Sequence, residues 1–254
     1  MDDRCTDPVG SIGWTERTGG VLRLREGLAL AGPLLRDELR IAAGFLAMAL
    51  RLHPGRRSVV DPAQLVPPDS AIARDAEAAA RDHLTPVLLN HSRRAYAWGA
   101  TIAALRQITF DHELLHVACM LHDTGLPSPV PHVDFTVRSA ALARALSDRH
   151  GIAADARELI ADAIAMHHTP GVSLDHGAEA FLLSAGAGVD VFGLRSNEIP
   201  DALRKSVVHE FPRLGFKREF AALWRAEARQ VPRGRAWYLR WFAMTDLTIR
   251  LAPF

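Results

Sequence analysis

Alanine and leucine dominate the chain from Ala71 onward, and long runs of β-branched residues are nearly absent. Alanine and leucine are strong helix formers, whereas β-branched side chains are enriched in strands. Glycine or proline follows several apolar segments, as expected where helices stop. The sequence therefore predicts an all-α fold, and Asp111 is expected to cap one helix. The predicted helices cover about 71–83, 86–106, 112–122, 133–149, 153–168, 176–186, 198–209, 214–229 and 235–250.

The first 70 residues differ in composition from the alanine- and leucine-rich remainder of the chain. Residues 1–20 are rich in glycine, aspartate and threonine and predict a loose leader, while residues 34–52 alternate apolar and charged side chains at helical spacing. Residues 53–70 carry four of the fifteen prolines and predict a loop. We therefore expect residues 1–70 to form an N-terminal extension packed on one helical domain of residues 71–254.

The net charge and the hydropathy of the chain argue against nucleic-acid and membrane partners. The chain of 254 residues has a net charge of +1, so nothing indicates attraction to nucleic acid. The apolar segment 41–50 is far shorter than the roughly 20 residues that span a bilayer, and the N-terminus lacks a secretory signal. We expect a cytoplasmic protein that binds a small-molecule substrate, with no nucleic-acid or membrane partner. A homo-oligomer is compatible with this composition.

Histidines and aspartates occur in or at the end of four apolar helical stretches. Neutral imidazole and carboxylate are ligand types that hold a divalent metal ion and leave a position open for water. The number of residues between successive sites fits the rest of one helix, a turn and much of the next helix. Antiparallel helices could therefore place these histidines and aspartates at the same height in a helical bundle. A break at Gly125 would let two adjacent ligands point the same way. The residues are His91, His122 with Asp123, His167, and Asp190.

The sequence around these residues resembles the HD-domain metalloprotein superfamily, whose signature is H…HD…D. The matching contexts are NHSRRAYAWGA, VACMLHDTG, AIAMHHTPG and AGAGVDVFG. Together with DFTVRSAALARAL (134–146) they look most like the cyanamide hydratase branch, in which HS-x-R-[VA]-Y precedes HD-x-G and D-x-x-G follows the histidine helix. The resemblance covers about residues 85–200.

The resemblance implies an HD-type helical bundle with a metal site in its core, holding one divalent ion, zinc or iron. It implies that His167 is an active-site histidine, either an extra ligand or a neighbour of the metal, and the doubled His168 could take this place instead. Arg94 matches an arginine that pairs with a site carboxylate. The implied metal ligands are His91, His122, Asp123 and Asp190.

The branch implies a metal-dependent hydratase or hydrolase, formally a hydro-lyase, that adds water to a small nitrile such as cyanamide and gives urea. An HD phosphohydrolase acting on a nucleotide or phosphomonoester is an alternative, and it needs basic residues such as Arg93, Arg94 or Arg138 at the pocket. An HD-type diiron oxygenase needs further ligands, which His168, His132 or Asp134 could supply. A degenerate HD scaffold is a further alternative, against which the complete ligand set argues.

The segment HELLH (112–116) matches the HExxH motif of zinc proteases, with His122 at the position of a third histidine. Those proteases need a glycine turn before the third histidine, and Cys119 stands there instead. On an unbroken helix His122 lies about 240° around the axis from His116. We therefore do not expect a protease, and we expect an ordinary helix face with Glu113 exposed.

Overall fold

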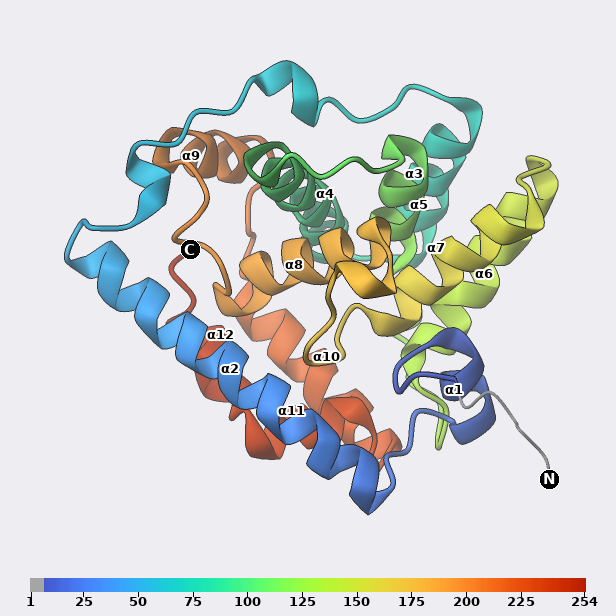
Figure 1. Ribbon diagram of the computed structural model, residues 1–254. Helices are drawn as coiled ribbons and strands as arrows, with labels where there is room; N and C mark the ends of the chain where they lie inside the picture. Colours follow the sequence, from blue (N-terminus) through green and yellow to red (C-terminus); the bar gives the residue numbers. More distant parts are fainter. Residues whose placement is uncertain (1–6) are drawn as a thin grey trace.

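The computed structural model describes residues 7–254, which form helices joined by turns and loops (Figure 1). These residues contain no β-strand, only isolated bridges at Val21–Gly234 and Val130–Val133. The predicted all-α fold is therefore confirmed. The α-helices are α1 (Ile12–Thr18), α2 (Leu24–Ala49), α3 (Ala71–His83), α4 (Pro86–Arg106), α5 (His112–Leu121), α6 (Phe135–Arg149), α7 (Ala154–Met166), α8 (Ala178–Phe192), α9 (Asp201–Glu210), α10 (Phe216–Gln230), α11 (Arg235–Phe242) and α12 (Thr245–Leu251).

Two predictions about helices are wrong. The single helix expected over 235–250 is broken into α11 and α12, because Met244 adopts the left-handed conformation with φ of 45°. The leader expected over residues 1–20 is ordered where it is described: α1 is helical and its Trp14 is only 2% exposed. Residues 1–6 lie outside the described residues.

Helices α4 and α8 pack against each other at the centre of the molecule, and this pairing positions the site. They approach most closely at Gly186, where an added Cβ atom would lie 2.1 Å from the carbonyl oxygen of Ala95. Only glycine fits such a contact. His91 lies one turn before Ala95 and Asp190 one turn after Gly186, so two antiparallel helices bring these side chains together.

The other helices surround this pair. Helix α5 packs against α3, α4, α7 and α8, and α7 also packs against α6. Helix α10 packs against α4, α11 and α12 and closes the other side. Asp111 caps α5 as predicted, accepting hydrogen bonds from the backbone of Glu113 and Leu114. None of the described helices is long and apolar enough to cross a bilayer.

The N-terminal segment contacts the remaining helices at several points. Helix α1 packs on α6 and α7, where the Ile12 amide donates to Asp162 at 2.8 Å. Helix α2 runs along the outside of the molecule (Figure 1) and buries Leu30, Leu34 and Ile41. The loop after it holds only the short 3-10 turns η1 (Pro54–Arg56) and η2 (Pro62–Leu65). Division of the chain at residue 70 stays a prediction.

Candidate metal centre

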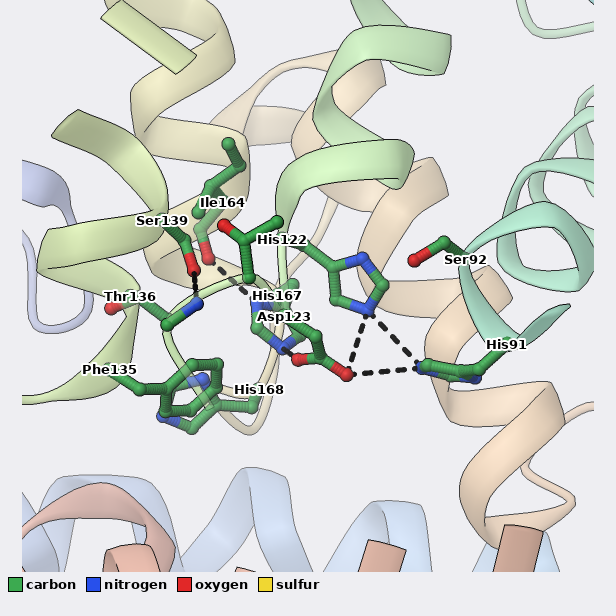
Figure 2. Close-up of polar contacts among 12 residues, drawn as sticks. His91, Ser92, His122, Asp123, Phe135, Thr136, Ser139, Ile164, His167 and His168 are labelled. Atoms are coloured by element: carbon green, nitrogen blue, oxygen red, sulfur yellow. Dashed lines mark hydrogen bonds and ion pairs between the residues drawn. The ribbon is translucent and has the colours of Figure 1, made fainter. Parts of the chain in front are cut away.

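Three of the predicted ligands meet in the core. His91 is on α4, while His122 and Asp123 directly follow α5. His91 Nε2 lies 3.2 Å from His122 Nε2 and 3.6 Å from Asp123 Oδ2, and His122 Nε2 lies 3.4 Å from the same oxygen (Figure 2). All three side chains are at most 1% exposed. Their ligand atoms lie close enough together to bind one metal ion.

The hydrogen bonds of the histidine rings fix which nitrogen faces this cluster. Each Nδ1 contacts an oxygen that can only accept, so each Nδ1 carries the proton and a neutral ring has its lone pair on Nε2. The three rings therefore direct lone pairs toward the cluster, as metal ligands do. The contacts are His91 Nδ1 to Asp190 at 2.8 Å, His122 Nδ1 to the Cys119 carbonyl at 2.7 Å, and His167 Nδ1 to the Ile164 carbonyl at 2.7 Å.

The cluster fits a divalent cation. Asp123 is 1% exposed, and neither of its carboxylate oxygens has a hydrogen-bond partner within residues 7–254. A buried, unpartnered carboxylate is costly, and two imidazole lone pairs facing each other are repulsive. A cation among these atoms would remove both penalties, and two imidazoles with a carboxylate suit zinc or iron.

The turn after α5 differs from the predicted break. His122 keeps helical angles, with φ of −57° and ψ of −33°, so no non-helical residue separates it from Asp123. The helix instead ends in a turn closed by a hydrogen bond from the Leu126 amide to the Asp123 carbonyl. Gly125 is required for space, because an added Cβ atom would lie 2.2 Å from the Phe135 carbonyl oxygen.

Asp190 is placed differently from the predicted four-ligand set. Its carboxylate contacts Nδ1 of His91, on the edge of the ring away from Nε2, so it lies behind His91. Arg94 donates to both oxygens at 2.8 Å, and Arg213 and Trp98 donate to Oδ1 at 3.0 and 3.2 Å. With both oxygens engaged, Asp190 orients His91, and direct binding of a metal stays a prediction.

Two arginines, Arg94 and Arg213, offset the negative charge of the buried Asp190 carboxylate. Although burial opposes ionisation, Arg94 and Arg213 hold the pKa of the Asp190 carboxyl well below its usual range. Arg94 is fully buried and forms the bidentate pair expected of it, but it does not line the cavity beside the cluster. Arg213 was not identified from the sequence, because it lies in a segment without a recognisable motif.

The two adjacent histidines face different partners. His167 Nε2 lies 3.7 Å from Asp123 Oδ1, and its ring packs edge-on against His122. His168 Nε2 lies 3.6 Å from Asp134 Oδ2, and its ring stacks on Phe135 (Figure 2). Burial lowers the pKa of both imidazoles, so both are neutral at pH 7. The structure thus places His167, and not His168, beside the cluster.

Comparison with known families finds one similarity, which includes the residues of the cluster. The family model of the HD domain matches residues 88–204. Residues 88–204 are therefore similar to an HD domain. The matched segment includes the three clustered residues together with His167 and Asp190. No curated protein matches the chain. The similarity to an HD domain and the buried cluster together support metal-dependent hydrolase chemistry.

Asp134, one of the three residues suggested for a second metal, has other partners. Asp134 Oδ1 caps α6 by accepting from Thr136, and Asp134 Oδ2 accepts from the fully buried Arg235 at 2.9 Å. Although burial opposes ionisation, Arg235 and His168 hold the pKa of Asp134 far below its usual range. His132 is exposed on a turn with φ of 59°. These positions give little support to a diiron site.

A cavity of about 90 Å³ opens beside the cluster of His91, His122 and Asp123. His91, Asp123, His167 and His168 form its polar end. Helix α2 contributes two acidic residues, and no lysine or arginine lines the cavity among the described residues. The acidic residues are Asp37 and Glu38, and apolar walls come from Leu34, Ile41, Phe220, Trp224 and Leu239.

The HELLH histidines lie outside the metal cluster. His116 is 4% exposed and packs edge-on against Tyr96 in a separate cavity that also contains Glu77. Burial lowers the pKa of His116 to about 4. The expectation of an ordinary helix face is therefore wrong for His116, and Glu113 is half-buried instead of exposed. The exposed His112 contacts the Tyr96 hydroxyl.

Proposed function

We propose that the protein is a metal-dependent hydratase that adds water to a small uncharged nitrile such as cyanamide, giving urea. The size of the cavity carries this proposal. It measures about 90 Å³, and a single water needs about 10–15 Å³ by the same kind of measure. A solute of a few heavy atoms fits there, whereas a nucleotide is much larger.

The charge of the cavity also favours an uncharged substrate. Asp37 and Glu38 would repel a phosphate group, and no described cationic side chain lines the cavity to attract one. The arginines that a phosphohydrolase could have used have other partners. Arg94 binds Asp190, Arg93 binds Glu77, and Arg138 donates to the Gly125 carbonyl.

Each residue at the polar end has a defined part in the addition of water. A divalent ion held by His91, His122 and Asp123 would lower the pKa of a bound water from about 15.7 toward about 7. His167 is neutral and has its Nε2 lone pair free, so it can accept a proton from water beside Asp123. Return of that proton to the nitrile nitrogen forms a C–O bond, breaks one C–N π bond and gives isourea. Transfer of the remaining O–H proton to the same nitrogen then forms the C=O bond, breaks the second C–N π bond and gives urea.

His168 can assist on the substrate side. It lines the same cavity, and neither ring nitrogen has a hydrogen-bond partner in the described part of the chain. Its neutral ring offers one N–H and one lone pair, which suits a substrate nitrogen. Apolar side chains on the remaining walls, such as Phe220 and Trp224, would keep bulk water away from the reacting group.

The test is urea formation by purified protein whose zinc or iron content has been measured. We expect urea from cyanamide near neutral pH and its loss in His122→Ala. His112→Ala is the matched control, because His112 is exposed on the helix that leads to His122. Metal-loaded protein that forms no urea across neutral pH would contradict the proposal. Hydrolysis of p-nitrophenyl phosphate would favour a phosphohydrolase, and two irons per chain would favour an oxygenase.

A further inference from the structure

The outer side of α2 carries a row of uncovered leucines. Monomeric proteins rarely leave contiguous apolar surface of this kind open to water. The opposite side of the same helix is buried through Leu30, Leu34 and Ile41. Helix α2 therefore has two apolar faces, of which the described chain covers one. The exposed leucines, called the leucine stripe below, are Leu24 (75% exposed), Leu28 (66%), Leu35 (61%), Leu39 (62%), Leu46 (61%) and Leu50 (58%).

The leucine stripe follows two series with a period of eleven residues. One series is Leu24, Leu35 and Leu46, and the other is Leu28, Leu39 and Leu50. Eleven residues make three turns at about 3.67 residues per turn, close to the 3.6 of a straight α-helix. The side chains therefore stay in one line along the helix, which lies at the outer edge of the molecule (Figure 1).

The stripe is also symmetric about Asp37. Each leucine of the stripe before this residue has a leucine at the same separation after it, and Ala31 and Gly32 have small counterparts in Ala43 and Ala42. Where two antiparallel copies of α2 meet at Asp37, leucine therefore faces leucine and small residue faces small residue at these five levels. The matched positions are Leu24 with Leu50, Leu28 with Leu46, Leu35 with Leu39, Ala31 with Ala43, and Gly32 with Ala42.

We propose that the leucine stripe is a homodimer interface, in which α2 packs antiparallel against α2 of a second copy of this chain. A two-fold interface uses one patch on both copies and must be self-complementary, so that residue i meets j and j meets i. The symmetry about Asp37 provides this match. Alanine and glycine at the intervening level let the two helix backbones approach closely.

The exposed area is sufficient for a stable pair. At roughly 100 Å² per leucine, six leucines bury about 600 Å² per copy and about 1,200 Å² in the dimer, the lower end of stable interfaces. Phe242 is also 62% exposed, and it lies near α2. Its ring lies 4.8 Å from that of Tyr238, whose hydroxyl donates to the Gly27 carbonyl of α2.

The arginines beside the stripe predict opposite effects of salt on dimer formation and on binding to a lipid surface. Arg25, Arg36 and Arg40 are exposed along one edge of α2. In an antiparallel pair the same edges meet, so these arginines lie on the rim and repel weakly. Salt should therefore strengthen the dimer. Binding of a basic, leucine-rich helix to an anionic membrane would instead weaken with salt.

The first test is the oligomeric state of the full chain. We expect a dimer by sedimentation equilibrium, and at least about a 100-fold weaker association in Leu39→Glu, because symmetry puts two unpaired carboxylates in one interface. Leu159→Glu is the matched control, since Leu159 is a half-exposed leucine of α7 outside the stripe. Circular dichroism checks that each variant is folded. A wild type that stays monomeric at its highest soluble concentration, or an unaffected Leu39→Glu dimer, would overturn the proposal.

The second test fixes the orientation of the helices. In a Cys5→Ser background, Leu24→Cys combined with Leu50→Cys should form covalent dimers on oxidation, because these positions face each other. Leu24→Cys alone should not, since its counterpart lies at the far end of the partner helix. Cross-linking by Leu24→Cys alone would indicate parallel helices and overturn the pairing. Flotation of a monomeric wild type with phosphatidylcholine–phosphatidylserine vesicles, abolished by Leu39→Glu, would assign the stripe to a membrane instead.

Discussion

Asp190 accepts a hydrogen bond from Nδ1 of His91 at 2.8 Å and thereby directs Nε2 of the same ring at the metal cluster. This carboxylate is also the partner of two arginines, Arg94 and Arg213. One buried side chain thus fixes a ligand tautomer and balances two positive charges. Its removal should affect metal binding and stability together.

Asp190→Asn should therefore weaken metal binding by about 10–100-fold, the usual effect of losing a group that orients a ligand. It should also lower the free energy of unfolding by about 3–5 kcal/mol, because the charge of the fully buried Arg94 loses its partner. Calorimetric titration with zinc and urea unfolding of the metal-free protein measure the two effects.

His112→Ala is the control for this pair of measurements, because His112 is exposed and lies outside the cluster. It should change neither quantity by a comparable amount. A larger loss of metal affinity in His112→Ala than in Asp190→Asn would revive the HExxH interpretation.

Asp123→Asn should abolish metal binding while stabilising the metal-free protein. Asp123 is a buried carboxylate without a hydrogen-bond donor among the described residues, whereas an asparagine amide can donate to the Nε2 lone pair of His91 or His122. Relief of the unpaired charge should contribute about 1–3 kcal/mol. Urea unfolding in the presence of a chelator compares the two proteins.

When urea unfolding is repeated with saturating zinc, wild type should become more stable than Asp123→Asn. Wild type gains stability by mass action, about 4 kcal/mol at a free metal concentration 1,000 times the dissociation constant, and Asp123→Asn gains none. Equal stabilities of the two proteins in chelator would show that Asp123 has another partner and is not held unpaired for a cation.

His167→Ala and His168→Ala should separate two roles. His167 faces Asp123, so its loss should lower the rate of urea formation by about 100–10,000-fold, the range for a lost general base. His168 faces Asp134, so its loss should act mainly on stability and on the Michaelis constant. Steady-state kinetics with cyanamide and thermal unfolding of both variants provide the comparison. A larger fall in kcat for His168→Ala would exchange the assignments.

Much of the fold follows from local signals in the sequence. Ser70 and Thr85 each precede a helix and accept a hydrogen bond from its first turn, and both helices start at the predicted residues. The helical spacing seen over residues 34–52 does not show where α2 begins, because the helix starts at Leu24 and contains Pro33. Met244 gives no glycine or proline signal for the break between α11 and α12.

The sequence predicted only those site residues that have recognisable local motifs around them. His91 and the His122-Asp123 pair are surrounded by short motifs that can be recognised locally. Arg235 has no recognisable motif around it in the sequence, yet it is fully buried against Asp134. About a hundred residues separate these partners, and only the packing of α11 near α6 brings them together.

Glu227 should make stability depend on pH above the range of ordinary carboxylates. It is 1% exposed on α10, and one oxygen accepts from the Phe135 amide at 3.0 Å while the other has no partner within the described residues. Burial, with the nearby Asp134 carboxylate, raises the pKa of Glu227 to about 8. The folded protein therefore keeps this proton at neutral pH.

The sign of the effect follows from proton binding. Between about pH 4.5 and pH 8 the unfolded chain has released the proton while the folded protein retains it, so rising pH favours unfolding by up to about 1.4 kcal/mol per unit. Glu227→Gln keeps a neutral side chain and removes this slope. Urea unfolding at pH 5, 6.5 and 8 should show the advantage of Glu227→Gln over wild type growing with pH. Glu210→Gln, on the exposed surface of α9, is the control. Parallel pH profiles for wild type and Glu227→Gln would mean that Glu227 is already ionised in the folded protein.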